Sequence, residues 1–438
     1  MADKINIFWF RRDLRLEDNV GLYYALKSKL PVLPIFIFDK EILESLPKDD
    51  ARVTFIHKIL SDINDTLKEK VGRSLTFFHN TPSEVFNQLN KMYSIHTVFT
   101  NHDYEPYAIK RDLGIEALLK SNGIDFKTYK DQVIFETIEI VKDNGTPYKV
   151  YTPYSKKWMN TLKSNQLKTY NSKDYLKNLI NNSNLSFLTL KDLGFEVSSQ
   201  TIEPYNISET IINNYESTRN FPEKEGTSKL GPHLRFGTVS VRKMVTKAIQ
   251  SDNITFLKEL IWREFFMQII WHFPNTVTCS FKPQYDAIQW RNSKNEFKAW
   301  CEGKTGYPLV DAGMRELNET GFMHNRVRML VGSFLCKHLL IDWRLGEAYF
   351  AEKLHDYELS SNVGNWQWVA GCGVDASPYF RIFNPTTQIQ KFDKDHIYIK
   401  KWVPEYQELT YPQPIVDHKF ARERCLRVYK EALDNYLK

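Results

Sequence analysis

The first 130 residues alternate between short runs rich in apolar and β-branched residues and longer stretches with helical periodicity. Strands are expected over 5–10, 32–38, 74–79, 97–101 and 125–129, and helices between them, for instance over 51–70 and 108–122. Such alternation is typical of a parallel sheet covered on both faces. The N-terminal part is therefore predicted to be a doubly wound, Rossmann-like α/β domain, which would bind ligands at the carboxyl ends of its strands.

The rest of the chain follows a different pattern. From about residue 131 to 203 the periodicity fades and Asn, Ser, Lys and Thr accumulate, including Asn182 and Ser183, so a surface connection is expected. Past residue 205 apolar residues repeat at helical spacing, as in Leu257, Ile261 and Phe265. The expected division is an α/β domain over 1–130, a connection over 131–203 and an all-α domain over 204–438.

Composition limits the classes of partner and compartment. The chain has 10 Trp, 23 Tyr and 28 Phe, enough rings to make stacking on a planar ligand plausible. Its net charge of +6 favours a polyanionic partner only if the charge is clustered. Five scattered cysteines without a C-x-x-C pair indicate a reducing compartment and argue against a zinc site. No apolar run approaches the roughly 18 residues that span a bilayer, so a cytoplasmic protein with no membrane partner is expected.

Two short patterns each place different chemistries on one helical face. Glu259, Trp262 and Arg263 are spaced i, i+3 and i+4, which brings a carboxylate, an indole and a guanidinium together. A surface ion pair beside a half-buried Trp would explain the same spacing. The side chains of the second pattern could belong to the hydrophobic core and its rim. They could instead line a pocket that takes a flat apolar ring and a phosphate. The three residues of this pattern are Asn325, Arg328 and Met329.

The stretch 362–368 is the hardest to explain as packing alone. If it is helical, Trp366 and Trp368 point to roughly opposite sides, since two residues turn about 200°. One indole is expected to face a buried redox cofactor and the other a substrate cavity. The polar residues Asp356, Glu358 and Asn362 could instead form a solvated helix face.

Other segments allow both a purely structural and a functional interpretation. Residues 225–230 are expected to open a helix, whose free N–H groups could hold a phosphate or form an ordinary N-cap. Arg11 to Arg15, after the first strand, would normally be a solvated charged turn, and no G-x-G-x-x-G follows it. Trp290, Trp343 and Trp366 fall in separate expected helical segments and are core residues by default. Motifs for hydrolases, zincins and Walker A loops are absent from the sequence.

Taken together, these segments resemble the photolyase/cryptochrome family over essentially the whole chain. The matching segments, in family order, are 9–16, 225–228, 259–265, 306–312, 323–329, 362–368 and 379–385. The resemblance implies an N-terminal antenna domain and a helical domain that holds FAD in a folded conformation. The implied FAD-binding residues are Tyr215, Thr227, Ser228, Lys229, Leu230, Arg328, Asp356, Glu358 and Asn362.

The same resemblance assigns the remaining site residues. Trp366, Trp343 and Trp290 match a chain of tryptophans that passes electrons inward from the surface. The implied lesion-contacting residues are Glu259, Trp262, Asn325, Met329 and Trp368, and the residues expected at DNA phosphates are Arg263, Arg326 and Arg381. The expected partner is UV-damaged DNA bound by a monomer.

The subtype can be argued from chemistry. A cyclobutane pyrimidine dimer is a compact pair of bases with polar edges that must be flipped out of the duplex. Two indoles, a methionine, a carboxylate and an amide suit it, as in class I dimer photolyases. The (6-4) photolyases look different at Asn325, where a histidine would be expected. The implied activity is light-driven repair by one electron from excited, reduced FAD; a cryptochrome-like blue-light photoreceptor is the alternative.

The antenna is less defined. Family members that use a folate antenna carry an Asn-Glu pair where this chain has Tyr107 and Ala108. Folate binding in that mode is therefore not expected. A deazaflavin, FMN or no second chromophore remain open.

Overall fold

The structure is a computed structural model that describes residues 4–181 and 187–436. The chain divides into two compact units, one of residues 1–139, 160–203 and 230–250, the other of residues 140–159, 204–229 and 251–438. Each unit recruits segments from several parts of the chain. The boundaries near residues 130 and 203 drawn from the sequence stay a prediction.

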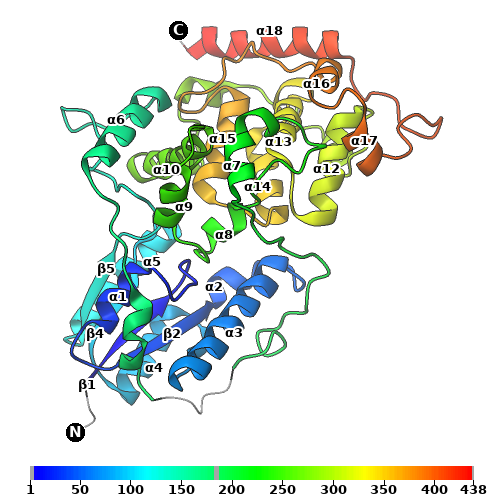
Figure 1. The fold of residues 1–438 in the computed structure, drawn as a ribbon. Helices are drawn as coiled ribbons and strands as arrows, with labels where there is room; N and C mark the ends of the chain where they lie inside the picture. Colours follow the sequence, from blue (N-terminus) through cyan, green and yellow to red (C-terminus); the bar gives the residue numbers. More distant parts are fainter. Residues whose placement is uncertain (1–3, 182–186, 437–438) are drawn as a thin grey trace. The chain divides into compact units, whose positions relative to one another are not determined.

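The first unit is built on a five-stranded parallel sheet with the strand order β3-β2-β1-β4-β5 (Figure 1). All five predicted strands are confirmed, with small shifts at their ends. Their bounds are β1 Lys4–Phe10, β2 Val32–Asp39, β3 Thr76–Asn80, β4 Ser94–Asn101 and β5 Asp125–Tyr129. The helices that follow are α1 Val20–Leu26, α2 Lys40–Leu43, α3 Ala51–Val71, α4 Pro82–Met92 and α5 Pro106–Ser121.

Strands β1 and β2 of the sheet are buried on both faces, which explains why they are nearly continuous apolar runs. In β1, Phe8 and Phe10 face the core shared with α1 and α3, whereas Ile7 and Trp9 face the core shared with α4 and α5. This alternation follows from the two-residue period of a strand. The doubly wound α/β prediction is therefore confirmed.

The charged turn after β1 is buried rather than solvated, so the interpretation as a solvated turn is wrong. Arg15 donates to both carboxylate oxygens of Asp131 at 2.7 Å, and Arg11 donates to Asp112 at 2.5 Å. The guanidinium of Arg242 also donates to Asp131, at 2.9 Å. Buried charges need such partners, and here the partners tie the end of β1 to segments distant in sequence.

The expected surface connection contains regular structure. Helix α6 spans Tyr151–Ser164 and crosses the division between the units, and a 3-10 helix, η1, spans Ser172–Asn178. Trp158 of α6 is buried and donates its indole N–H to Glu264 at 2.6 Å. Residues 182–186 of the connection, including Asn182 and Ser183, lie outside the described residues. Two short helices of the first unit come later in the chain, α8 Gly231–Arg235 and α9 Val241–Ala248.

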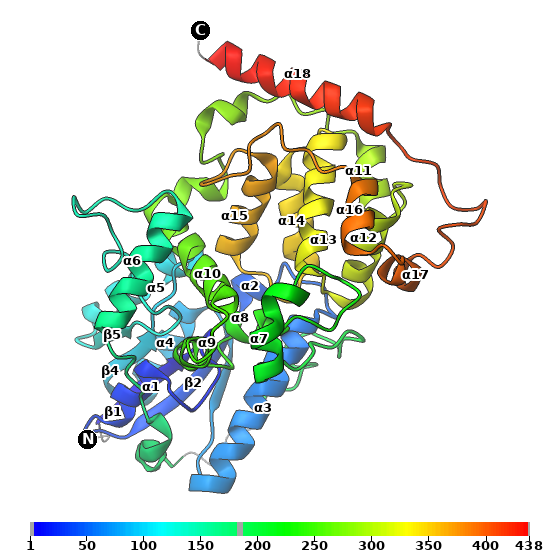
Figure 2. The same cartoon turned by 45° about the horizontal axis from the view of Figure 1, so that its top comes forward.

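The regular elements of the second unit are helices among its described residues, as predicted, apart from one isolated β-bridge between Val141 and Pro147. Its helices are α7 Glu209–Thr218, α10 Thr255–His272, α11 Lys294–Cys301, α12 Pro308–Thr320, α13 Asn325–Ser333, α14 Trp343–Lys353, α15 Leu359–Ala370, α16 Pro385–Phe392, α17 Ile397–Trp402 and α18 His418–Tyr436. Short 3-10 helices, η2 Pro274–Val277 and η3 Pro283–Ala287, and one π-helical segment, η4 Phe334–His338, connect them. Helices α13, α14 and α15 lie side by side (Figure 2), and α10 packs on α15.

Within the described residues, no helix is long and apolar enough to cross a membrane.

Candidate functional site

Helix α10 presents the predicted mixed face. Glu259, Trp262 and Arg263 are all half-buried, and each has a partner elsewhere in the helical unit. The carboxylate of Glu259 pairs with Arg219, which follows α7. Trp262 stacks on Tyr151, with ring centroids 3.7 Å apart and planes 6° from parallel. The face is therefore an ordered arrangement of a carboxylate and an indole rather than a loose surface pair.

Helix α13 presents the second predicted face, with Asn325, Arg328 and Met329 all half-buried at i, i+3 and i+4. His324 caps the helix, because its Nδ1 accepts the backbone N–H of Arg326 at 3.2 Å. Arg328 forms a two-pronged pair with Asp356, at 3.1 and 2.9 Å. Such forked pairs fix orientation as well as charge, so α13 is tied to the loop before α15.

The polar run before Trp366 is not a solvated helix face. Glu358 and Asn362 are buried, and Asp356 is partly buried. Glu358 pairs with Arg263 at 3.4 Å, which ties α10 to the start of α15. Asn362 donates its amide to Glu347 on α14, at 3.0 Å to the backbone oxygen and 2.9 Å to the side chain. Burial raises the pKa of Glu347, which the Asn362 hydrogen bond partly offsets.

Arginines are concentrated around this part of the helical unit. Burial lowers the pKa of Arg326, and the charges of Arg219 and Arg381 lower it further. Burial, with the nearby charges of Arg328 and Arg326, lowers the pKa of His324 to about 3, so that histidine is neutral. These groups favour an anionic ligand.

Helix α15 carries both indoles. Trp366 is buried and packs on Phe350 and Trp300, with centroids 4.9 and 6.1 Å away. Trp368 is half-buried. Gly346 of α14 allows the close approach of the Trp366 ring, because any Cβ there would overlap it. The two side chains therefore differ in burial, and both pack in one hydrophobic cluster.

Trp343 and Trp290 pack in the same core as Trp366. Trp343 is buried at the first turn of α14, with the guanidinium of Arg344 4.7 Å from its ring centre. Trp290 is half-buried, and its ring meets Tyr429 edge-on at 6.0 Å. The expectation that Trp290 lies in a helix is wrong, since it lies in the irregular segment between η3 and α11.

The segment 225–230 does not open a helix at its hydroxyl residues. Helix α8 begins only at Gly231, and Leu230, at its N-cap, makes no side-chain capping bond. Thr227 and Ser228 lie instead in an irregular, half-buried loop. Gly226 lets this loop pack on α7, because a Cβ there would meet Thr218. Lys229 adopts a left-handed backbone with φ of 52°.

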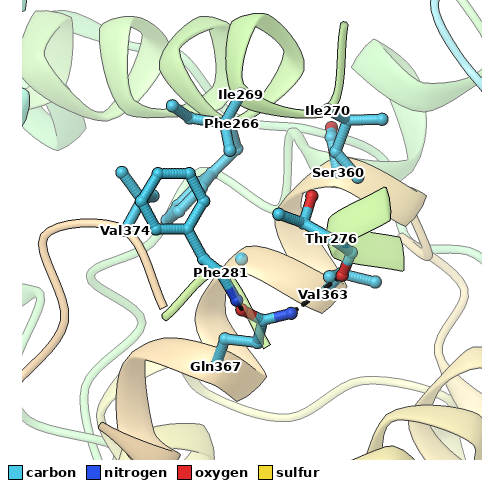
Figure 3. Close-up of a pocket in the computed structure, with 10 residues that line it drawn as sticks. Phe266, Ile269, Ile270, Thr276, Phe281, Ser360, Val363, Gln367 and Val374 are labelled. Atoms are coloured by element: carbon cyan, nitrogen blue, oxygen red, sulfur yellow. Dashed lines mark hydrogen bonds between the residues drawn. The ribbon is translucent and has the colours of Figure 1, made fainter. Parts of the chain in front are cut away.

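A small apolar cavity lies between α10 and α15 (Figure 3). Its walls include Phe266, Ile270, Phe281 and Val363, and its polar edge includes the hydroxyl of Ser360. Gln367 closes one side by accepting from the backbone of Phe281 at 2.9 Å and donating to the backbone of Thr276 at 2.8 Å. Phe266 lines the cavity and also packs on Trp262.

Three residues of this region escaped the sequence analysis: Arg219, Tyr151 and Glu347. Each touches a predicted site residue that is between 15 and 111 positions away in sequence. The helical spacing of Tyr151, Tyr154 and Trp158 could have revealed α6. No local signal points to Arg219 or Glu347.

The described residues also contain no group of three or more His, Cys, Asp or Glu side chains placed to hold a metal ion.

A doubly wound α/β unit combined with an all-helical unit is also the architecture of solved photolyases and of a cryptochrome, which defines the class of the fold. The family model described as DNA photolyase matches residues 6–172, and the FAD binding domain of DNA photolyase matches residues 256–410. The deoxyribodipyrimidine photo-lyase of Agrobacterium fabrum is 36% identical, covering 97% of both chains. That of a Synechococcus strain is 34% identical over 97% of this chain and 96% of its own. The chain belongs to the DNA photolyase family and is an enzyme with FAD as its cofactor.

Solved structures agree with this assignment. A bacterial class III photolyase from Agrobacterium tumefaciens matches with a TM-score of 0.87 and 34% identity, covering 99% of this chain and 98% of the other. An archaeal photolyase from Sulfolobus tokodaii, which contains two FAD molecules, matches at 0.81 and 32%, over 97% and 99%. A cryptochrome from Synechocystis matches at 0.85 and 26%, over 98% and 99%.

The residues present fit a dinucleotide cofactor. One buried donor, Nε2 of His324, has no hydrogen-bond partner among the described residues. Because Nδ1 of His324 accepts a hydrogen bond, its Nε2 carries the proton and can donate. Unpaired buried donors are costly unless a ligand satisfies them, and a diphosphate supplies acceptors and a compensating charge for the surrounding arginines.

Proposed function

We propose that this enzyme repairs cyclobutane pyrimidine dimers in DNA in a light-driven reaction. The observation that carries the proposal is the pair of half-buried faces on α10 and α13. They offer Glu259 and Trp262 on one helix and Asn325 and Met329 on the other. These groups match the apolar body and the polar edges of a flipped-out dimer.

The lesion contacts follow from the chemistry of each side chain. Trp262 and Trp368 would stack on the dimer, and Met329 would fill the space beside it. Glu259 and Asn325 would hydrogen-bond the polar base edges. The carboxylate of Glu259 could accept from base N–H groups, and Arg219, which pairs with it, would hold the carboxylate in place. The guanidinium of Arg219, rather than the carboxylate, would stabilise negative charge that develops on the base carbonyls.

The cofactor side would be formed by residues of α13, of the loop before α15 and of α15 itself. Arg328, Asp356, Glu358 and Asn362 would surround the ring system, and the phosphate and ribityl region would contact the segment near α7. That second group consists of Tyr215, Thr227, Ser228, Lys229 and Leu230. When bound and reduced, the flavin supplies on illumination the single electron that opens the dimer. The protein orients both partners and keeps water out.

The buried indoles support a separate role in reduction. Trp366, Trp343 and Trp290 would pass electrons inward, because the first two are buried and the third reaches the surface of the unit. Arg326 and Arg381 would neutralise phosphates beside the lesion. Arg263, also expected at phosphates, is paired with Glu358, so we assign it to holding α10 against α15.

A direct repair assay tests the proposal. The flavin-loaded, chemically reduced protein is illuminated with an oligonucleotide that contains one thymine dimer, and restored thymines are counted. A matched oligonucleotide with a (6-4) lesion is the control, because Asn325 stands where a histidine would be expected for that lesion. We expect repair of the dimer only. Absence of light-dependent dimer repair would refute the proposal.

Two finer points belong to the same proposal. The enzyme would act as a monomer in a reducing cytoplasm, in keeping with its five free cysteines. The structural similarity to a cryptochrome leaves blue-light signalling as the second candidate. A signalling protein would bind dimer-containing and undamaged DNA equally, whereas a repair enzyme would prefer the dimer.

A further inference from the structure

We propose that Tyr151 is a positioning residue for the lesion, because it fixes the plane of the Trp262 indole. This inference rests on the proposed function, in which Trp262 stacks on the dimer. No sequence motif assigns a role to Tyr151, the first residue of α6.

The tyrosine ring covers one face of the indole. The two rings are nearly parallel, 6° apart, with centroids separated by 3.7 Å. Phe265 meets the indole edge-on at 5.6 Å, and Phe266 lies tilted at 5.5 Å. Because Tyr151 covers one face, a stacked base would use the opposite face of Trp262.

The tyrosine itself is held at two points. Its hydroxyl donates to the backbone oxygen of Lys258 at 2.8 Å, one turn before Trp262 on α10. Its backbone N–H donates to Asp375 at 3.0 Å. Burial and the nearby carboxylate of Glu259 raise the pKa of Tyr151 above its usual value, so the phenol remains a donor. The Tyr151 ring therefore has a fixed orientation, and the Trp262 indole packs against it.

The fixed orientation of the Tyr151 ring matters because Trp262 is only half-buried. A partly exposed side chain loses rotamer freedom when it stacks on a ligand, and pre-ordering removes that cost from binding. Loss of an aromatic contact together with loss of ordering is expected to weaken dimer binding about tenfold, which corresponds to about 1.4 kcal/mol.

The test measures binding in the dark to an oligonucleotide with one thymine dimer and to the undamaged strand. Tyr151→Leu should weaken dimer binding about tenfold and change undamaged binding less than twofold. Tyr151→Phe, which keeps the ring and loses only the hydroxyl bond to Lys258, should weaken dimer binding by clearly less than tenfold. Tyr148→Leu is the matched control, because its ring contacts Tyr154 rather than the indole. Tyr151→Met, which keeps most of the volume without a planar ring, replaces the leucine variant if that variant does not fold.

A double-substitution cycle separates positioning from general damage. In the Trp262→Leu background, Tyr151→Leu should cause no further loss of dimer affinity, since both act through one stack. Additive losses, or full dimer affinity in Tyr151→Leu, would overturn the inference while leaving wild-type repair intact. A wild-type protein that does not prefer the dimer would instead refute the proposed function, and the inference with it.

Discussion

Replacing Gly346 by alanine tests whether Trp366 is as tightly confined as its neighbours indicate. A Cβ at this position would lie 2.5 Å from Cζ3 of Trp366, nearer still to Cη2, and 2.6 Å from Cδ2 of Leu335. Carbon atoms in ordinary contact are about 3.5–4.0 Å apart. The indole would have to move by about 1 Å, yet Phe350 and Trp300 pack against it.

The expected cost follows from two opposing terms. Overpacking a tight core costs about 1–3 kcal/mol, whereas replacing a helical glycine by alanine gains about 1 kcal/mol. Gly332→Ala is the matched control, because its Cβ would lie 3.1 Å from Val369 and 3.5 Å from the same indole. Gly346→Ala should therefore be less stable than Gly332→Ala by about 1–3 kcal/mol.

Urea unfolding followed by tryptophan emission compares the two variants, and illumination of the oxidised holoenzyme measures photoreduction. Gly346→Ala should lower the urea midpoint and slow photoreduction, because the displaced indole belongs to the proposed electron chain. Gly332→Ala should change both much less. Equal midpoints for the two alanine variants would refute the reasoning that Trp366 is confined by Gly346.

Two further predictions concern charge. Arg381→Gln should weaken binding of damaged and undamaged DNA alike and reduce the slope of log affinity against log salt by about 1, since one phosphate contact is lost; an unchanged slope would place Arg381 away from DNA. Burial lowers the pKa of both His324 and His338 to about 3. Because both bind protons only when unfolded, the free energy of unfolding should fall as pH drops from 6.5 towards 3, by up to about 1.4 kcal/mol per pH unit for each. His338→Asn should flatten that dependence in urea titrations at pH 7 and 5, and an unaltered dependence would contradict a neutral, buried His338.

The sequence predicts the strands and most helices because their signals are local. The runs at 32–38 and 125–129 sit within one residue of β2 and β5, since both are bounded by turn residues. The shared faces of α10 and α13 were also predictable, because i, i+3 and i+4 spacing fixes them once a helix forms.

Long-range pairing was not predictable from spacing. From the sequence alone, Arg15 is predicted to be solvated. In the fold, Asp131, 116 positions later, lies beside it and accepts its hydrogen bond. The pairing of Glu259 with Arg219 and the stacking of Trp262 on Tyr151 depend on helix packing in the same way. A local sequence pattern therefore does not show whether a polar side chain is buried against a partner that is distant in sequence.

Helix α15 is proposed to carry two indoles with separate functions, one in reduction and one at the lesion. Trp366→Phe and Trp368→Ala are compared in two assays, photoreduction of the oxidised flavin and dimer repair by pre-reduced enzyme. Trp366→Phe should slow photoreduction and leave repair largely intact, whereas Trp368→Ala should weaken dimer binding and repair and leave photoreduction intact. Equal losses in both assays for either variant would contradict the account.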